Sequence, residues 1–368
     1  MSKENWVAAG AAVVLVLLIA LYGTHNPFET PANAPENIIP LGGFDGSGSF
    51  ADSLMAPSNL IASPSGATQA TGTKTETPAK QEPGIPPGLA LALGSLRDAL
   101  VNVICVSRDG STRSISGSGV MVSPEGLILT NAHVAQLFLL KDYPKKNNVV
   151  CVIRTGNPAQ TAYIAQLAYI SGPWIQNNAQ VLVSKDPKGS GENDFAVLAI
   201  TESATNDRLP SRFPFVPLSD EIPTDQEPVA IGSYGAQTLT SKQIKSSLYP
   251  TLVFGKVLDR FTFTKTTVDV LSLGGSAVAQ EGSSGGGVVN AKGELIAIIS
   301  TSSIDGNLSS RDLHAITVGH IRRSFESDTG ADFDVYLAST ATDTLIANFV
   351  DQAKKLSSII TSAISSSH

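Results

Sequence analysis

The fold is indicated most clearly by residues 117–134, which run Gly-Ser-Gly-Val-Met-Val-Ser-Pro-Glu-Gly-Leu-Ile-Leu-Thr-Asn-Ala-His-Val. Two apolar runs rich in Val, Ile and Leu flank the turn residues 123–126, a pattern typical of two strands joined by a tight turn. The second strand places His133 at its end. This stretch therefore predicts a β-hairpin that presents one imidazole.

Similar short runs, rich in Val and Ile and separated by Gly, Asp, Asn and Pro, lie on either side of this hairpin. We expect strands at 101–106, 119–122, 127–130, 149–153, 196–200, 228–231, 253–257, 288–289 and 295–299. Because no regular helices separate them, the pattern favours antiparallel barrels or a sandwich over a parallel α/β sheet. The spacing of Leu89, Leu93, Leu96 and Leu100 predicts one short helix before the first strand.

Two further segments carry side chains that could act together with His133. Asp194 stands just before the apolar run 195–200, and Ser284 lies in the glycine-rich turn 282–287. A serine hydroxyl becomes a good nucleophile when an imidazole accepts its proton, and a carboxylate orients that imidazole. Glycines around the serine let backbone N–H groups converge on one point, as an oxyanion hole requires. The order His, Asp, Ser differs from that of α/β-hydrolases and subtilisins.

Alternatives stay open within these segments. Asp186 and Asp220 compete with Asp194 as the carboxylate, and Ser283 competes with Ser284 as the nucleophile. Ser284 is the better candidate of the two serines because two glycines follow it directly. The glycine run lacks the Lys-Ser/Thr of a phosphate-binding loop.

The motifs Thr130–Val134, Asp194–Leu198 and Gly282–Gly286 resemble those of chymotrypsin-fold (trypsin-like) serine proteases, and most of all the HtrA/Deg type. The flanking segments 117–120, 289–296 and 314–317 also resemble that type. The resemblance covers roughly residues 89–325. It implies an all-β domain of two antiparallel six-stranded β-barrels.

The resemblance also implies a role for each matching position. His133 is the general base, Asp194 its orienting partner and Ser284 the nucleophile, with the N–H groups of Gly282 and Ser284 forming the oxyanion hole. Val278 lies at the base of the pocket for the side chain preceding the scissile bond.

A strand formed by Ser300, Thr301 and Ser302 is implied to pair with the substrate backbone. Because Val278 is apolar and has no acid nearby, we expect a small or medium apolar substrate side chain there. No cofactor and no metal are expected, and the expected partners are protein or peptide substrates.

Four departures from this family are visible. Ser283 stands where Asn or Asp is usual, and Gly287 replaces a proline, which we expect to make the loop more flexible. Asp194 follows His133 by 61 positions, more than the family uses, so the insertion at 156–193, with Trp174, is expected to form surface loops near the active face. No PDZ domain is expected after the protease domain.

The N-terminal region divides into an anchor and a tether. Residues 6–22 form an unbroken apolar run close to the length that crosses a bilayer, and the lysine before it places the N-terminus in the cytoplasm. A cleaved signal peptide is the competing interpretation and would make the protein secreted. Ten of the 21 prolines fall in residues 26–88, which predict a disordered, Pro/Ser/Thr/Gly-rich tether.

The domain division is therefore 1–25 cytoplasmic stub and transmembrane anchor, 26–88 tether, 89–330 protease domain and 331–368 helical extension. Apolar residues at Leu345, Phe349, Leu356 and Ile360 fit one face of an amphipathic C-terminal helix. This helix is expected to pack on the barrel, with a homo-oligomer contact as the alternative.

Composition limits the remaining classes of protein. With 25 Lys and Arg against 32 Asp and Glu, the chain has a net charge of −7 and no basic cluster, so nucleic-acid binding is disfavoured. The two cysteines, Cys105 and Cys151, are too few for a disulfide-rich scaffold and are compatible with either free thiols or one disulfide.

These observations predict a membrane-tethered, extracytoplasmic serine endopeptidase acting in protein quality control or processing. The alternative is a catalytically silent or latent relative that keeps the fold as a peptide-binding or scaffold module.

Overall fold

The computed structural model describes residues 85–183, 191–205, 207–263, 266–302, 311–339 and 341–366. The predicted anchor and almost all of the predicted tether lie outside these residues. No helix within the described ranges has the length and apolar character needed to cross a membrane.

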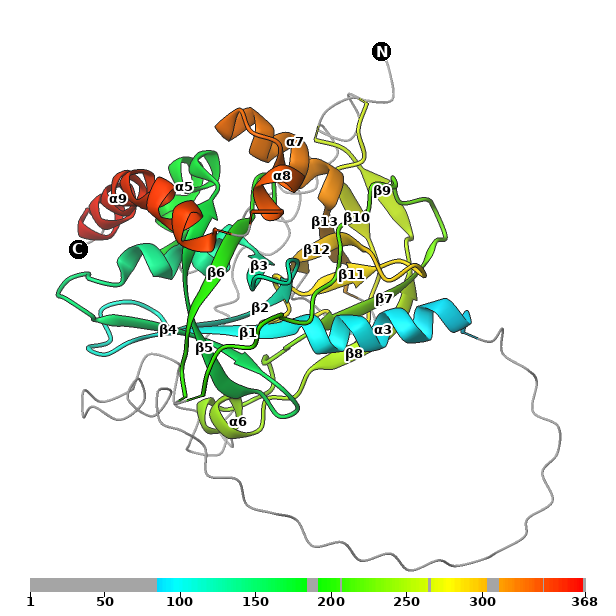
Figure 1. The fold of residues 1–368 in the computed structure, drawn as a ribbon, viewed down its shortest axis with the longest axis horizontal. Helices are drawn as coiled ribbons and strands as arrows, with labels where there is room; N and C mark the ends of the chain where they lie inside the picture. Colours follow the sequence, from blue (N-terminus) through cyan, green and yellow to red (C-terminus); the bar gives the residue numbers. More distant parts are fainter. Residues whose placement is uncertain are drawn as a thin grey trace, which may run out of the picture. The chain divides into compact units, whose positions relative to one another are not determined.

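The first barrel is closed, with the strand order β1-β2-β3-β6-β5-β4 (Figure 1). All its neighbouring strands are antiparallel. Its strands are β1 (Leu100–Ser107), β2 (Ile115–Met121), β3 (Leu127–Thr130), β4 (Val149–Thr155), β5 (Gln160–Ile170) and β6 (Ala196–Ser203). Apolar side chains on both faces of these strands are buried: Val120 and Leu129 lie on one face and Leu198 on the other. The predicted antiparallel hairpin and six-stranded first barrel are confirmed.

The second antiparallel barrel is formed by a seven-stranded sheet in the order β8-β7-β11-β12-β13-β10-β9, so the predicted second barrel is confirmed, but its strand number is seven instead of six. The strands are β7 (Pro228–Ser233), β8 (Thr251–Lys256), β9 (Asp259–Phe261), β10 (Val270–Ser272), β11 (Gly287–Val289), β12 (Leu295–Ser302) and β13 (Leu313–Thr317).

The physical reason for this difference is a bend between β8 and β9. Val257 N–H still donates to Glu227 O beside β7, whereas Leu258 N–H donates to Ser272 O on β10. One stretch of chain therefore changes partners at this point and forms both edges of the sheet.

The predicted N-terminal helix is confirmed as α3 (Pro87–Ala99), which starts with proline in its first turn. Leu89, Leu96 and Ala99 are buried. The helix lies along β7, β8 and β11 (Figure 1). Leu100, which the helical spacing included, instead begins β1.

The segment between His133 and Asp194 is ordered where it is described, so the expectation that 156–193 forms surface loops is wrong for most of it. It contains β5, which pairs with both β4 and β6, then α5 (Gly172–Asn178) and the short 3-10 helix η2 (Ala179–Leu182). Ser171 Oγ accepts a hydrogen bond from Trp174 N at 3.2 Å and caps α5. Trp174 is buried, with 5% of its surface exposed.

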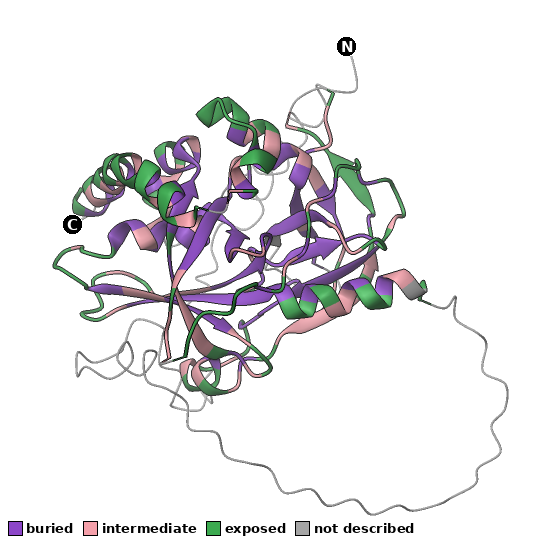
Figure 2. Cartoon of the chain, viewed as in Figure 1, coloured by how far each residue is buried: buried purple, intermediate pink, exposed green. Residues whose placement is uncertain are grey.

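Three helices, α7 (Val318–Thr329), α8 (Phe333–Leu337) and α9 (Thr342–Ser365), form the C-terminal part. α9 packs on β5, on α5, on η2 and on the 3-10 helix η1 (Gln136–Leu140), and Ser357 Oγ donates to Leu139 O at 2.8 Å. Figure 2 shows a buried stripe and an exposed stripe along α9. The predicted amphipathic helix packed on the barrel is confirmed.

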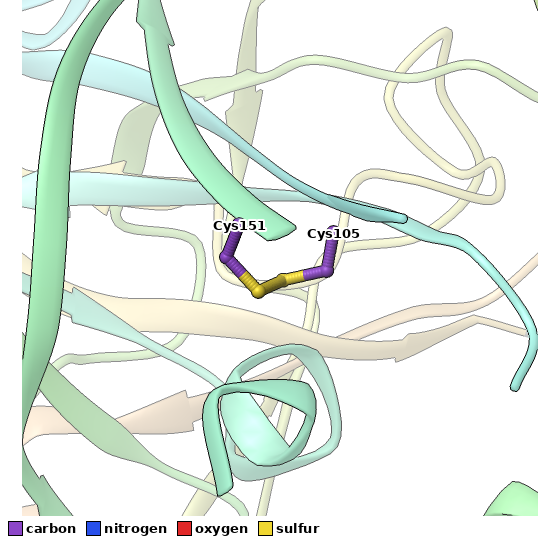
Figure 3. Close-up of a disulfide and its surroundings, with 2 residues drawn as sticks. All are labelled: Cys105 and Cys151. Atoms are coloured by element: carbon purple, nitrogen blue, oxygen red, sulfur yellow. A yellow bond between two sulfur atoms is a disulfide. The ribbon is translucent and has the colours of Figure 1, made fainter. Parts of the chain in front are cut away.

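Cys105 and Cys151 form a disulfide (Figure 3). The sequence alone was compatible with either this bond or two free thiols. The two cysteines are directly opposite each other in the register of β1 and β4. The bond therefore fastens two neighbouring strands of the first barrel.

Loss of this disulfide is expected to destabilise the protein. The cysteines are separated by 46 positions, for which loop-closure entropy gives about 4 kcal/mol, and measured effects are typically about 2–4 kcal/mol. Chemical denaturation of the full-length Cys105→Ser/Cys151→Ser protein should show a loss of unfolding free energy in this range. Wild-type protein treated with a reductant is the matched control, and unchanged midpoints in both samples would contradict the expectation.

Candidate active site

His133 lies directly after β3, in the short helix α4 (Ala132–Ala135). Its backbone N–H donates to Asp194 Oδ1 at 2.9 Å, and its ring Nδ1 lies 2.7 Å from Asp194 Oδ2. An ionised carboxylate only accepts hydrogen bonds, so Nδ1 carries the proton and Nε2 is left as the acceptor. The ring is therefore held in the tautomer that a general base needs.

Asp194 stands between a turn and β6. The turn is made by Asn193, which has a positive φ of 58°. Only 3% of Asp194 is exposed, and its backbone carbonyl accepts a hydrogen bond from Asn131 Nδ2 at 2.8 Å. Asp220, a competing candidate, instead forms an exposed ion pair with Arg322, and Asp186 lies outside the described residues. Of the described candidates, Asp194 is the carboxylate that contacts His133.

The environment of His133 changes its pKa in two opposing ways. Burial lowers the pKa of this imidazole, but the negative charge of Asp194 and the hydrogen bond to it act in the opposite direction and prevail. The pKa of His133 is therefore raised above its ordinary value.

Ser300 connects the two barrels at this site, and sequence reasoning missed the role of its side chain. Ser300 Oγ donates to Asp194 Oδ2 at 3.1 Å, while Ser300 O accepts a hydrogen bond from Ser284 Oγ at 3.3 Å. The sequence had placed Ser300 only on a strand for substrate pairing. No local signal indicated the contact, because Asp194 and Ser300 are 106 positions apart.

The two adjacent serines differ clearly in exposure. Ser283 is buried, with 1% of its surface exposed, and its hydroxyl accepts a hydrogen bond from Ser233 Oγ at 3.0 Å. Ser284 is partly exposed. The Ser284 hydroxyl donates to Ser300 O. The structure describes both Ser284 and His133 and has no hydrogen bond between them. Ser284 is thus the serine whose hydroxyl is available to a substrate.

Residues 281–285, called the oxyanion loop below, carry the Gly282 and Ser284 N–H groups that the resemblance assigned to an oxyanion hole. Gly282 and Gly285 have positive φ values of 89° and 84°, which favour glycine. Glu281 O accepts a hydrogen bond from Ala236 N at 2.8 Å, so the N–H of the same peptide, that of Gly282, points the opposite way. Among the described residues, neither Gly282 N–H nor Ser284 N–H has a hydrogen-bond partner. Both are free to bind a developing negative charge.

Gly287, expected to loosen this loop, lies in β11 and is buried. A Cβ at this position would meet Leu96 Cδ1 at 2.7 Å and Val120 Cγ2 at 2.8 Å. The structure thus gives a packing reason for glycine here, namely the close approach of α3 and β2.

The predicted pocket residues lie beside the oxyanion loop. Val278 is fully buried and belongs to one apolar cluster with Ile299, Leu313 and Ala315. Ser300, Thr301 and Ser302 end β12, whose pairing with β11 stops at Ile298 and whose pairing with β13 continues to Ser302. Among the described residues, the edge of 300–302 that faces away from β13 therefore has no partner strand. Binding of a peptide as an added strand requires such an edge.

Chemically, the arrangement offers a hydroxyl, an oriented imidazole and two backbone N–H donors that have no hydrogen-bond partner among the described residues. No group of three His, Cys, Asp or Glu side chains suited to a metal occurs among the residues that the structure describes.

Residues 117–298 match the family model of the trypsin-like peptidase domain. The chain is therefore a chymotrypsin-fold serine protease, a class of serine endopeptidases. The match begins in β2 and ends in β12, and so includes His133, Asp194 and Ser284.

Two solved structures illustrate the likeness. The active form of the Rv3671c protease from M. tuberculosis is 16% identical, with a TM-score of 0.41, covering 70% of this chain and 95% of that one. The serine endoprotease from Yersinia pestis is 22% identical, with a TM-score of 0.39, covering 72% of this chain and 68% of that one. Both scores are below 0.5, so the class assignment rests on the family match. No curated protein matches the chain.

Proposed function

We propose that this chain is a membrane-tethered, extracytoplasmic serine endopeptidase that cleaves proteins or peptides through an acyl-enzyme on Ser284. The observation that carries this proposal is the hydrogen-bonded connection from Asp194 to His133 and, through Ser300, to the Ser284 hydroxyl. It joins a base, its orienting acid and a nucleophile from two different barrels.

In the first half of the reaction, Ser284 Oγ attacks the substrate carbonyl carbon and its proton passes to His133 Nε2. The carbonyl oxygen becomes an oxyanion and accepts hydrogen bonds from the N–H groups of Gly282 and Ser284. His133 then gives the proton to the leaving amine as the C–N bond breaks.

In the second half, a water molecule attacks the acyl carbon while His133 again accepts a proton. The bond from Ser284 Oγ to the acyl group breaks, and the hydroxyl recovers its proton from His133. Throughout both halves, Asp194 holds the ring orientation and stabilises the imidazolium.

The apolar surroundings of Val278 support a preference for a small or medium apolar side chain before the scissile bond. The unpaired edge at Ser300, Thr301 and Ser302 supports binding of the substrate backbone as an added strand. Cleavage of a peptide library mainly after Arg or Lys would refute this preference.

The location is proposed from two features. The apolar run at 6–22 provides an anchor, and a flexible chain of the tether's length has a reach of about 45 Å. The disulfide between Cys105 and Cys151 supports an extracytoplasmic domain, because cytosolic thiols are generally kept reduced.

A latent form of the same enzyme is a second candidate. Its supporting observation is that Ser284 Oγ donates to Ser300 O instead of His133. In substrate-free enzymes the hydrogen bond between the nucleophile and the base is often long or absent, and it forms only when a substrate binds. Latency predicts that reactivity rises when a peptide is added.

The proposal is tested by treating the full-length protein, purified in mild detergent, with a fluorophosphonate probe and locating the adduct by mass spectrometry. We expect one adduct on Ser284 and loss of casein hydrolysis as the adduct forms. Labelling that requires an added peptide supports the latent form. Absence of both labelling and hydrolysis, with and without peptide, would establish the silent scaffold instead.

A further inference from the structure

We propose that Ser118, in β2 of the first barrel, is a positioning residue that holds the oxyanion loop of the second barrel in its reactive conformation. The inference rests on the proposed function, because it concerns the N–H groups of Gly282 and Ser284. Ser118 itself does not contact the reacting atoms.

The Ser118 hydroxyl bridges two backbone segments that border the hole. It donates to Gly282 O at 2.8 Å and accepts from Tyr234 N at 2.8 Å. Ser118 has no exposed surface, and Tyr234 is 1% exposed. A hydroxyl supplies both a donor and an acceptor at one point, which an apolar side chain of this size cannot do.

The backbone of Ser118 contacts the same loop. Its N–H donates to Ser284 O at 2.7 Å. Ser118 therefore binds the carbonyl oxygens of both residues whose N–H groups form the hole.

These contacts matter because the loop is built on glycines. Gly282 has a positive φ, and glycine readily adopts other backbone angles. The peptide before Gly282 is held by Ala236 N through Glu281 O, and the peptide after it is held by the Ser118 hydroxyl through Gly282 O. Removing the hydroxyl releases the second of these two peptides.

Ser118 also links the loop to β3, the strand that precedes the short helix with His133. Thr130 Oγ1, at the end of β3, donates to Ser118 O at 2.7 Å. The path from Thr130 through Ser118 to Gly282 thus connects the base side of the site with the oxyanion side. A Cβ on Gly285 would lie 2.0 Å from Ser118 O, which shows how closely the two segments approach.

The test measures the rate constant of fluorophosphonate labelling across pH in full-length wild type, Ser118→Ala and Ser116→Ala. Loss of a direct oxyanion donor lowers rates by about 10²–10³-fold. Ser118 acts only through the position of such donors, so we expect Ser118→Ala to lower the labelling rate constant about tenfold on its high-pH plateau. The pH midpoint should stay unchanged, because the contacts between Asp194 and His133 remain. A rate constant is unaffected by the fraction of molecules that fold.

Ser116 is the matched control because it lies on the same strand, and its hydroxyl accepts from Asn102 Nδ2 at 3.0 Å, away from the loop. Its variant should label within about twofold of wild type. If Ser118→Ala does not fold, Ser118→Cys keeps a similar side chain with weaker hydrogen bonds and should show the same direction of change.

An unchanged plateau in a folded Ser118 variant would overturn the inference. A shifted midpoint would overturn it as well, because it would indicate a disturbed base. Absence of labelling in wild type is a separate outcome, since it rejects the proposed function.

Discussion

Replacing Ser284 with alanine is expected to abolish hydrolysis and labelling, lowering kcat by about a millionfold. This is the magnitude found when the nucleophile of a serine protease is removed. Ser284 is the partly exposed serine of the pair, and its hydroxyl contacts Ser300, which also contacts Asp194. The measurement is peptide hydrolysis together with the stoichiometry of fluorophosphonate labelling in the full-length protein.

Ser283→Ala is the matched control, because it removes the neighbouring hydroxyl from the same loop. That hydroxyl is buried and bound to Ser233 Oγ, so its loss is expected to lower the rate by no more than about tenfold. The reverse result, with labelling lost in Ser283→Ala and kept in Ser284→Ala, would show that the nucleophile is wrongly assigned.

Replacing Asp194 with asparagine is expected to lower kcat by about 10⁴-fold near neutral pH. A neutral amide cannot stabilise the imidazolium, and its NH₂ group can hold His133 in the wrong tautomer. Asp194 Oδ2 accepts hydrogen bonds from both His133 and Ser300. An NH₂ group in the place of this oxygen cannot accept either bond.

The same variant should change the pH dependence of the residual activity. Activity requires unprotonated His133, so the rate rises as pH passes upward through its pKa. In wild type the charge of Asp194 raises that pKa, which places the acid limb above the ordinary value. Without the charge, burial lowers the pKa, so the acid limb of Asp194→Asn should move to lower pH.

The measurement is kcat/KM for a peptide substrate across pH in both proteins. An acid limb that stays in place, or moves to higher pH, would contradict the assignment of Asp194 as the charged partner. Asp220→Asn is the control, since Asp220 is exposed and pairs with Arg322. It should leave both the rate and the limb unchanged.

Local sequence predicted the parts of the fold that depend on short-range patterns. The hairpin containing 127–130, the helix α3 and the stripe of α9 all follow from hydrophobic spacing and from turn residues. Strand β5 was missed because residues 156–193 were interpreted as an insertion of surface loops, on the ground that His133 and Asp194 are farther apart than in the family. Its end nevertheless carries a readable signal, since Ser171 and the following Gly-Pro cap α5.

The sequence predicted strands β7, β8, β11 and β12 of the second sheet but not β9, β10 and β13. Strands β9, β10 and β13 are three to five residues long, and short runs give a weak periodic signal. The bend at Val257–Leu258 is set by hydrogen bonds to Glu227 and Ser272, residues distant in sequence. Such a bend has no local signature.

By itself, the sequence determined the kinds of chemical group and their order: an imidazole after a strand, a carboxylate before another, and a serine among glycines. Their chemistry depends on residue type, and turns and strands of a few residues fix each one locally. Tertiary structure alone decided the contacts between them, including the exposure of Ser284 over Ser283, the bridge through Ser300 and the pairing of Cys105 with Cys151. The physical reason is that contacts between segments 40 or more residues apart depend on how strands pair within a barrel and how the two barrels pack, which no local pattern encodes.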